Sequence, residues 1–587
     1  MASTVAESLL LLSQLNDIYH KILARDHVTC FLKDVLRQLK IRYSLTDADR
    51  EHIPSTGPLI VVANHPFGAI EGIILADILL SRRLDAKIMA NHLIGCIPEM
   101  REILIFVDPF GTDNSLRKNV GPLKEAIRWV QRGGALGIFP GGGVSHFRIL
   151  RNEITDPDWS DTVAGIIRKT NASVIPVYFD GTNSKVFQMA GLVHRRFRTA
   201  LLPRELLNKR NQDIQIYVGK AISSEKLASL PTDRAMISYL RFRTYALRHR
   251  RRHINPVKGG PMIFEGQKTR TVAAVSQTLD SHLIKTDVQR LNGKHILLEN
   301  EEFAVIHGQA HEIPNLLQEI GRLRETTFRL VGEGTGRAVD LDRFDLYYTH
   351  LFLWNKQKEE IVGAYRLGDV NSIVRRHGID GLYTSSLFHY RPAFLEHITD
   401  ALELGRSFVR PEYQRHYSSL FFLWKGIGHF VARHPRHRTL FGPVTISNTY
   451  TSLSRELIVS YLKTNTSIDG ATELVRPKLP LRLTSPKGRE TRAFTNFIRD
   501  IEELSELISD IEFDQKGIPV LLRHYLKLGG KLVGFTVDRS FSDGLDGLIM
   551  LDLTRCDPKL LRHYMGKDGV RAFFGYHQGK TLLDLAS

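Results

Sequence analysis

Cysteine is scarce in this 587-residue chain, and its positions lie far apart. Cys30, Cys96 and Cys556 form no CxxC pair, so neither a disulfide framework nor a zinc site is predicted. Long apolar runs are also missing: no window of about 18 uncharged apolar residues occurs, and any membrane association is expected to be peripheral. The N-terminus has no basic segment before its apolar residues, so no signal peptide is expected. A reducing cytoplasm fits these absences.

The composition is that of a globular protein with an uneven charge. Hydrophobic residues make up 42% and charged residues 24% of the chain, and the length predicts two to four domains. The net charge is +17, and the segment 191–253 alone holds 15 Lys and Arg residues against 4 Asp and Glu residues. Leucines interleave these cations, which suits an anionic lipid surface. A nucleic-acid partner is not expected, because neither stacking aromatics nor a known binding module accompanies the charge.

The stretch from Leu59 to Glu71 brings an imidazole and a carboxylate together at the end of a strand. It begins with the apolar run Leu-Ile-Val-Val-Ala, typical of a buried strand in a mostly parallel sheet. Pro66 ends the strand, and an apolar helix begins near Ala69. His65 therefore lies at the sheet edge where open α/β sheets hold their sites. With Glu71 it can form an oriented general base, or the pair can merely cap the helix and complement its dipole.

Asn64 and His65, followed by an acidic residue, resemble the His-x4-Asp signature of the glycerolipid acyltransferases. Here the acid is Glu71, six residues after the histidine, and Ile70 stands at the usual acidic position. This arrangement is similar to the hemolysin-like branch of the family. The resemblance implies His65 and Glu71 as catalytic residues and Asn64 as a substrate-binding residue.

Three later segments follow in the order of that family. Arg117 takes the place of an arginine that meets an anionic or polar acceptor, although an ordinary solvated arginine would fit equally well. The strand 135–139 runs into a glycine turn whose N–H groups can hold an oxyanion, unless it is only a tight turn. That turn resembles a Phe-Pro-Glu-Gly-Thr motif without its glutamate, which implies a different acceptor, and the strand 173–179 resembles the fourth motif. The substrate-binding glycines implied are Gly141, Gly142 and Gly143.

The second half of the chain follows another pattern. A helix around Arg324 precedes two strands at 351–354 and 361–367, a central strand at 402–409 and an amphipathic helix at 418–431. Helix, strand pair, central strand, loop and helix is an order that resembles the GNAT acyltransferase fold.

More narrowly, this half resembles the acyl-homoserine-lactone synthases and the ornithine N-acyltransferases, which take acyl chains from acyl carrier protein. The residues that carry this resemblance are Arg324, Phe328, Asp342, Asp345, Arg366, Glu403 and Arg406. It implies Glu403 as a catalytic base or amine-binding carboxylate and the others as substrate-binding residues. Arg406 could equally be the structural ion-pair partner of Glu403. The loop 414–418 lacks the glycines of the coenzyme-A-binding signature, which favours a carrier-protein donor.

A glycerolipid-type domain followed by an ornithine-acyltransferase-type domain resembles the bifunctional ornithine (amino-acid) lipid synthases. The resemblance implies an α/β protein with an acyltransferase domain over 1–255, a linker over 256–294 and a GNAT-like domain over 295–587. The C-terminal half would N-acylate ornithine or a similar amino acid with a 3-hydroxyacyl chain, and the N-terminal half would O-acylate that hydroxyl.

The expected partners are acyl carrier protein and a membrane lipid surface, with no cofactor or metal, at the cytoplasmic face of the inner membrane. Two alternatives stay open. One is a non-catalytic lipid- or carrier-protein-binding scaffold. The other is a bifunctional acyltransferase that acts on another amino-acid or lysolipid acceptor.

Overall fold

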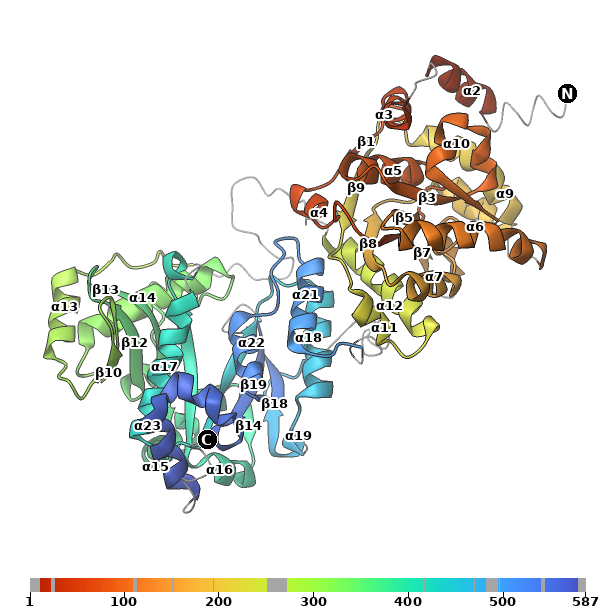
Figure 1. The fold of residues 1–587 in the computed structure, drawn as a ribbon. Helices are drawn as coiled ribbons and strands as arrows, with labels where there is room; N and C mark the ends of the chain where they lie inside the picture. Colours follow the sequence, from red (N-terminus) through yellow and green to blue (C-terminus); the bar gives the residue numbers. More distant parts are fainter. Residues whose placement is uncertain are drawn as a thin grey trace. The chain divides into compact units, whose positions relative to one another are not determined.

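The chain forms two compact units, each built around one main sheet (Figure 1). A computed structural model describes residues 11–22, 27–108, 113–149, 152–193, 195–250, 272–414, 417–468, 470–481, 495, 497–539 and 544–578. The first unit comprises residues 1–254 and 506–516, and the second comprises 255–505 and 517–587. Both units combine helices with mixed sheets, which confirms the predicted α/β fold class.

The first sheet has seven strands in the order β1, β9, β8, β2, β5, β3, β4. Their bounds in that order are Arg42–Ser44, Asp213–Val218, Ser173–Phe179, Leu59–Ala63, Ala135–Ile138, Ala86–Asn91 and Leu104–Val107. Neighbouring strands are parallel except β8 and β9. The predicted apolar strand, β2, lies between β8 and β5 with all five residues buried, so its C-terminal end opens in the middle of the sheet edge.

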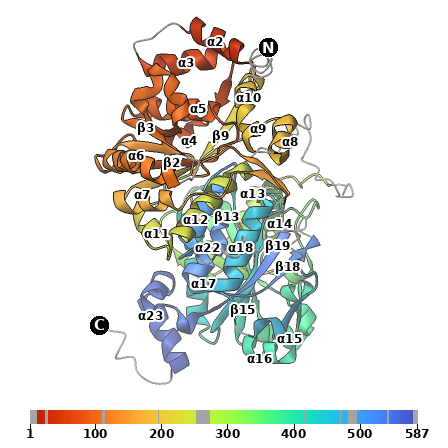
Figure 2. The ribbon, with the colours of Figure 1, turned by 90° about the vertical axis from the view of Figure 1, so that its right-hand side faces the viewer.

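Helices cover both faces of this sheet, because alternate residues of a strand point to opposite sides. Leu59, Val61 and Ala63 share a core with residues of α3 (Val28–Gln38) and α5 (Ile70–Arg82). Figure 2 shows α2 (Leu12–Lys21), α3 and α5 on one side of the sheet and α7 (Thr162–Thr170), α11 (Ser224–Ala228) and α12 (Asp233–Ala246) on the other. Further elements of this unit are α4 (Asp47–Glu51), α6 (Asp113–Gln131), α8 (Lys185–Val193), α9 (Arg195–Ala200), α10 (Leu202–Asn208), β6 (His146–Arg148) and β7 (Glu153–Thr155).

The first unit also takes in the segment 506–516, which begins inside α21 (Ile501–Ile511). Asp510 is 1% exposed and lies 2.5 Å from Arg243 Nη2 and 3.5 Å from Arg250 Nη2. The backbone N–H of Lys220 donates to the same carboxylate at 3.1 Å. A carboxylate from the C-terminal part of the sequence thus neutralises two buried arginines of the first unit.

The second sheet has eight strands in the order β10, β11, β12, β13, β15, β16, β19, β18. Their bounds in that order are Ile296–Glu299, Phe303–Gln309, Thr349–Asn355, Glu360–Asp369, Ala401–Val409, Thr439–Ile446, Gly544–Asp552 and Lys531–Asp538. All neighbours are antiparallel except β15 and β16, which run parallel.

Two different sets of helices cover the faces of the second sheet. Phe352 and Trp354 of β12 pack with α14 (Pro314–Leu330). On the opposite face, Gly426 of α17 (Tyr417–Arg433) lies against Leu351, and α17 packs on α23 (Pro558–Gln578). The other elements are α13 (Ser281–Arg290), α15 (Val370–His377), α16 (Pro392–Ile398), α18 (Ser452–Asn465), α19 (Ala471–Leu474), α22 (Val520–Lys527), β14 (Phe388–Tyr390), β17 (Val475–Pro477) and the short 3₁₀ turns η5 (Arg343–Leu346) and η7 (Tyr383–Ser386).

Part of the predicted linker falls within the second unit. Its residues 281–290 form α13, which packs on α14. Residues 256–271 of the linker lie outside the described residues, as do residues 415 and 416 of the predicted donor loop.

Candidate active sites

His65 and Glu71 meet at the C-terminal end of β2. His65 Nδ1 lies 2.9 Å from Glu71 Oε1, and the His65 side chain is 19% exposed whereas that of Glu71 is fully buried. The Glu71 carboxylate also accepts the backbone N–H groups of Phe67, Gly68 and Ala69 at 2.8, 2.7 and 3.1 Å. The two side chains meet across six residues of sequence because the tight turn at 67–69 folds the start of α5 back onto the end of the strand.

The electrostatics of this pair suit a proton acceptor. Burial alone would raise the pKa of Glu71, but the His65 charge and the backbone donors lower it below its usual value. Burial alone would lower the pKa of His65, but Glu71 and, more weakly, Asp156 raise it. Glu71 therefore stays ionised near neutral pH and strengthens the basicity of an imidazole whose outer side is accessible.

Asp156 joins the histidine to the glycine turn, a role that no sequence pattern indicated. Its buried carboxylate accepts the backbone N–H of His65 at 3.1 Å, the indole N–H of Trp159 at 3.0 Å and the hydroxyl of Ser145. The Ser145 N–H in turn donates to His65 O at 2.8 Å. Gly141 packs close to this group, since a Cβ there would lie 3.1 Å from Asp156 Cβ. The glycine turn is thereby fixed beside His65.

The other predicted residues of this unit occupy different positions. Asn64 is 2% exposed, and its amide group exchanges hydrogen bonds of 2.9 and 2.7 Å with the backbone of Phe179, which ties the ends of β2 and β8 together. Gly142 donates its N–H to Phe139 O within the turn, so Gly141 and Gly143 are the better candidates for an oxyanion. Arg117 is exposed on α6 and is not among the described contacts of His65 or Glu71.

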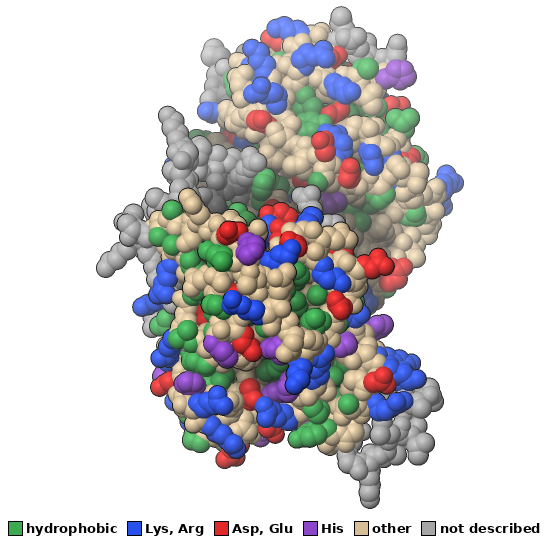
Figure 3. Space-filling model, turned by 90° about the vertical axis from the view of Figure 1, so that its left-hand side faces the viewer, with side chains coloured by type: hydrophobic (Ala, Val, Ile, Leu, Met, Phe, Trp, Pro, Cys, Tyr) green, Lys and Arg blue, Asp and Glu red, His purple; other side chains and the backbone are tan. Residues whose placement is uncertain are grey.

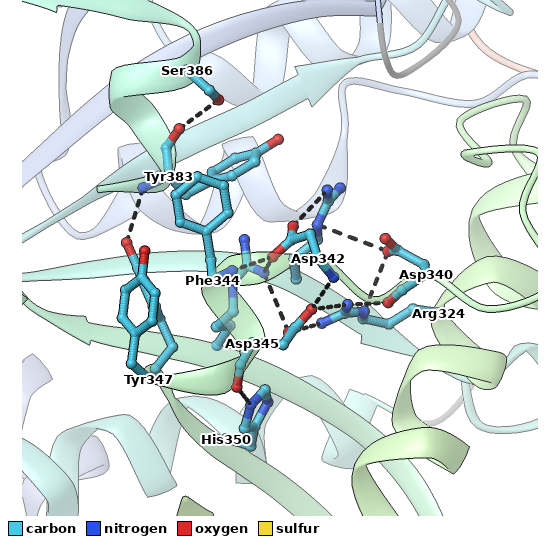
Figure 4. A network of polar contacts seen from close by, with 12 residues as sticks. Arg324, Asp340, Asp342, Phe344, Asp345, Tyr347, His350, Tyr383 and Ser386 are labelled. Atoms are coloured by element: carbon cyan, nitrogen blue, oxygen red, sulfur yellow. Dashed lines mark hydrogen bonds and ion pairs between the residues drawn. The ribbon is translucent and has the colours of Figure 1, made fainter. Parts of the chain in front are cut away.

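In the second unit, three arginines and three aspartates form one buried network (Figure 4). Arg324 Nη1 and Nη2 donate to the two oxygens of Asp345 at 2.9 and 3.0 Å. Arg366 Nη1 lies 2.7 Å from Asp342 Oδ1 and 3.2 Å from Asp345 Oδ1. The structure thus brings together predicted residues from α14, η5 and β13.

Arg406 and Asp340 complete the network. Arg406 Nη2 lies 3.3 Å from Asp342 Oδ2, and Arg406 Nε lies 3.8 Å from Asp340 Oδ2. Asp340 also faces Arg324, with Nε to Oδ2 at 3.2 Å, and it was not predicted from the sequence. Arg406 has a left-handed φ of 47°, at a place where the pairing of β13 and β15 shifts register. Such a conformation is uncommon for a residue other than glycine and turns the side chain toward the aspartates.

Aromatic rings enclose the Arg366 guanidinium. Its carbon lies 5.1 Å from the ring centre of Tyr383, 5.2 Å from that of Tyr348 and 5.6 Å from that of Phe344. Tyr383 also lies 5.0 Å from the Arg406 guanidinium. These cation–π contacts hold the two arginines in a dry environment. The predicted Phe328 lies elsewhere, partly buried in the core of α13 and α14.

Glu403 lies on the same face of the second sheet as the arginine–aspartate network and is 1% exposed. It accepts the N–H of Thr384 at 2.7 Å, the N–H of Tyr383 at 3.2 Å and the hydroxyl of Tyr348. Burial raises its pKa despite these donors. Glu403 therefore anchors the η7 turn that presents Tyr383 to the two arginines.

The sheet opens next to this network. Parallel pairing of β15 with β16 covers only Ala401–Glu403 opposite Thr439–Phe441, although β15 stays paired with β13 as far as Val409 and β16 with β19 as far as Ile446. At Gly442 the two strands still approach each other closely, since a Cβ there would meet the Leu404 carbonyl oxygen at 2.0 Å. Beyond it the facing edges of the two strands can pair with an extended ligand.

Two more carboxyl groups lie on the network side of this opening. Asp546 of β19 is 3% exposed and accepts the Thr445 hydroxyl at 2.7 Å. Burial, with a smaller contribution from Asp538, raises its pKa to about 7. Glu333 follows α14, and burial together with the charge of Asp546 also raises its pKa to about 7. Each can exchange a proton near neutral pH.

Comparisons with known proteins identify both units. A family model described as an acyltransferase matches residues 15–252, and one described as an acetyltransferase (GNAT) domain matches residues 323–425. A glycine N(alpha)-acyltransferase of Bacteroides thetaiotaomicron is 33% identical over 280 residues, which cover 45% of this chain and 81% of that protein. The chain belongs to the glycine N(alpha)-acyltransferase family. It is an acyltransferase with an acyltransferase-type and a GNAT-like domain.

Two further relatives have related names. A lyso-glycine lipid O-acyltransferase of Phocaeicola vulgatus is 24% identical over 222 residues, 34% of this chain and 76% of that protein. An L-ornithine N(alpha)-acyltransferase of Brucella abortus is 24% identical over 285 residues, 47% of this chain and 90% of that protein. This acyltransferase is thus similar to enzymes named for the N-acylation of amino acids and to one named for the O-acylation of a lyso-glycine lipid.

The surface of the acyltransferase carries less free charge than the basic segment 191–253 suggests. Arg243 and Arg250 in this segment are buried beside Asp510, and Arg248 lies 3.8 Å from Glu153. The side chains of Arg195 and Arg196 lie outside the described residues. On the face drawn in Figure 3, basic side chains are spread among acidic and hydrophobic ones. Within the described ranges, no helix has the length and apolar character needed to span a membrane.

Proposed function

We propose that this acyltransferase makes a diacylated amino-acid lipid in two steps, an amide bond first and an ester bond second. The observation that carries the proposal is that one chain holds two separate sites of different chemistry. The pair of His65 and Glu71 in the first unit is suited to a hydroxyl acceptor. The arginine–carboxylate network beside the opened sheet of the second unit is suited to an amino acid.

The amide step belongs to the second unit. Arg366 is 1% exposed, and its Nε and Nη2 find no hydrogen-bond partner among the described residues, which supports binding of the acceptor carboxylate. The neutral amine attacks the thioester carbon, the N–C bond forms and the C–S bond breaks. The proton lost by the amine passes through a base to the leaving sulfur, which departs as the thiol. Asp546 takes the amine proton in this proposal, because Glu403 already holds three donors of the η7 turn.

The ester step belongs to the first unit. His65 takes the proton of the 3-hydroxyl on the N-acylated amino acid as the oxygen attacks the second thioester, and it returns the proton to the leaving sulfur. Glu71 orients the imidazole, and the N–H groups of Gly141 and Gly143 face the developing oxyanion. Acyl carrier protein is the proposed donor of both chains, and the cytoplasmic face of the inner membrane is the proposed location.

The acceptor is a small α-amino acid, and the named relatives make glycine and ornithine the two compounds to test. Ornithine carries a second ammonium group, for which Glu333 and Asp538 provide carboxyl groups near Asp546. We therefore expect ornithine to be accepted, with glycine as the competing acceptor.

The test uses the purified full-length chain, either amino acid and two donors: carrier protein loaded with a 3-hydroxyacyl chain and carrier protein loaded with a plain acyl chain. The lipids formed are identified by mass spectrometry. The wild type should make the monoacylated and then the diacylated lipid. His65→Ala should accumulate the monoacylated lipid with ester formation reduced at least 100-fold. Loss of amide formation with intact esterification would show that the two sites are assigned in reverse, and no product with either amino acid would favour a binding scaffold.

A further inference from the structure

Helix α8 of the first unit is apolar on its inner and its outer side. Phe187, on the inner side, is fully buried, whereas Val186, Met189 and Leu192 are 48%, 62% and 53% exposed. An α-helix has about 3.6 residues per turn, so these three exposed side chains lie on one outward face of α8. A helix that is apolar all round is normally buried. Among the described residues this outward face stays uncovered, which indicates an apolar partner outside the chain.

The elements that pack on α8 continue its apolar character. Phe197 of α9 is 56% exposed, and Ile149, directly after β6, is 71% exposed. Both α9 and β6 pack on α8, and a Cβ at Gly191 of α8 would lie 3.3 Å from Arg198 Cδ of α9. Figure 2 shows α8 and α9 together at the edge of the first unit. Exposed apolar side chains of this size on neighbouring elements are typical of an interaction surface.

The sequence around α8 carries only positive charges. Residues 181–204 hold five Lys and Arg residues and no Asp or Glu residue. Lys185 is exposed and lies on the outward face of α8, one helical turn before Met189. Arg198 contributes a second cation where α9 meets α8. Apolar side chains bordered by cations match the hydrocarbon and the anionic headgroups of a lipid bilayer.

The start of α8 is tied to the turn that binds Glu71. Asn183 Nδ2 donates to Phe67 O at 3.0 Å, and the N–H of Phe67 donates to Glu71 Oε1 at 2.8 Å. Ser184, directly before α8, donates its N–H to the buried carboxylate of Glu205 in α10 at 2.9 Å. These hydrogen bonds hold α8 beside the catalytic pair of the first unit. A bilayer in contact with α8 would therefore lie close to that pair.

We infer that the outward face of α8, with Lys185, Met189 and Leu192, docks the first unit onto an anionic lipid bilayer and so brings the acceptor of the ester step to His65. The docking follows from the surface itself, whereas the delivery of the acceptor rests on the proposed function. That acceptor carries a long hydrocarbon chain and partitions into a bilayer. A site held at the bilayer meets such an acceptor at a high effective concentration.

The binding test is co-sedimentation of the full-length chain with vesicles of phosphatidylglycerol and phosphatidylethanolamine in equal parts. The wild type should bind, and more weakly at high salt. Met189→Asp combined with Leu192→Asp should weaken binding at least about 30-fold, because two apolar side chains become charges that the anionic lipid repels. Lys185→Gln should weaken it about 3- to 6-fold.

Leu84→Asp combined with Val120→Asp is the matched control for the double variant. Both side chains are exposed in the same unit, at 85% and 50%, and neither belongs to α8 or to the elements that pack on it. Val120 lies on α6, which Figure 2 shows on the opposite side of the unit from α8. This control adds the same charge and removes the same number of apolar side chains, and it should bind vesicles within about 3-fold of the wild type.

An activity measurement separates this inference from the proposed function. Ester formation is compared for monoacylated lipid presented in the vesicles and for a short-chain, water-soluble 3-hydroxyacyl amino acid. Met189→Asp combined with Leu192→Asp should raise the apparent KM for the vesicle-bound acceptor at least about 10-fold and leave kcat/KM for the soluble acceptor within about 3-fold. If neither acceptor is esterified but vesicle binding changes as expected, the proposed function alone fails and the docking surface stands.

Unchanged vesicle binding by the double variant would overturn the inference. If that variant instead loses affinity for acyl carrier protein, the face belongs to an acidic protein partner. If the wild type is a dimer in sedimentation velocity and the double variant is a monomer, the face belongs to a second copy of the chain. Thermal melts of the double variant should match those of the wild type, because exposed side chains contribute little to stability.

Discussion

Tyr365 and Arg366 are consecutive residues of β13, and their side chains lie on opposite faces of the same sheet. Arg366 lies 2.7 Å from Asp342 and stacks on Tyr383, whereas Tyr365 lies beside Trp424 of α17. One strand therefore separates a charged environment from an apolar one at the point where β15 and β16 part. An amino acid and an acyl chain have these contrasting requirements, and the opening between the strands is where they can meet.

The pH dependence of ester formation should report the pair of His65 and Glu71. His65 must be neutral to accept a proton, and Glu71 raises its pKa above the usual 6.5. The rate of ester formation should therefore rise with pH through a pKa above 6.5. In Glu71→Gln this limb should move to lower pH, while the maximal rate falls because the imidazole loses its orientation. The measurement is the pH–rate profile of esterification of a supplied monoacylated lipid.

Asp85→Asn alters an acidic residue of the same unit that pairs with Arg83, and it should leave the profile unchanged. An unshifted limb in Glu71→Gln would show that another group sets the pH dependence.

Much of the scaffold could be predicted because its signals are local. The strands at 59–63 and 402–409 and the helix at 418–431 are continuous apolar or amphipathic segments, and the structure has β2, β15 and α17 at those places. The partners that complete the sites could not be predicted. Asp156 approaches His65 across 91 residues and Asp546 approaches Thr445 across 101. Their local sequences carry no periodic pattern, so only the folded chain brings them together.

The positive φ of Arg406 and the place of the segment 506–516 in the first unit could not be predicted from the sequence for a similar reason. Nothing in the residues around Arg406 requires a positive φ. The conformation occurs where the pairing of β13 and β15 shifts register and where Arg406 lies near Asp340 and Asp342. The pairing of Asp510 with Arg243 spans 267 residues and crosses the expected domain division.

Ionisation of the buried Asp546 side chain should destabilise the second unit as the pH rises. The pKa of Asp546 is about 7 in the folded protein and about 3.9 in the unfolded chain. The protonated side chain therefore makes its full contribution to folding stability below pH 4, and this contribution is lost as the pH rises through 7. Asp546→Asn keeps the acceptor for Thr445 and should become more stabilising by about 2–3 kcal/mol between pH 5 and pH 8, at about 1.4 kcal/mol for each pKa unit. Thermal melts at the two pH values measure this difference.

Asp552→Asn is the matched control on the same strand. Arg438 holds the pKa of Asp552 below its usual value against the effect of burial, so its removal should destabilise rather than stabilise at pH 8. An advantage for Asp546→Asn that is equal at both pH values would contradict an ionised, buried Asp546.

Glu403→Gln should separate positioning from proton transfer. The glutamine amide cannot accept all three donors now bound to Glu403, so the second unit should lose about 1–3 kcal/mol of stability. Amide formation should fall about 100-fold because the η7 turn no longer holds Tyr383 against Arg366 and Arg406. Esterification of a supplied monoacylated lipid should continue.

The residual amide activity of that variant distinguishes the two roles. If Asp546 is the base, the limb of the pH–rate profile near pH 7 should persist in Glu403→Gln and disappear in Asp546→Asn. The reverse result would return the catalytic role to Glu403, as its place in the sequence suggested.

Asp510 should support the first unit from the distant end of the sequence. Arg243 and Arg250 have side chains only 6% and 4% exposed, so Asp510→Ala would leave buried charges short of a partner and should lower the free energy of unfolding by about 3–5 kcal/mol. On gentle heating, ester formation should be lost at a lower temperature than in the wild type, whereas amide formation should change little.

Asp514→Ala, in the same segment but with a side chain 57% exposed beside Lys516, should cost less than about 1 kcal/mol. A first unit expressed without residues 506–516 should share the weakness of Asp510→Ala, so activity assays on separated halves would report instability rather than chemistry. Equal thermal stability of Asp510→Ala and the wild type would show that Asp49, the other carboxylate at Arg250, is sufficient for the charge balance.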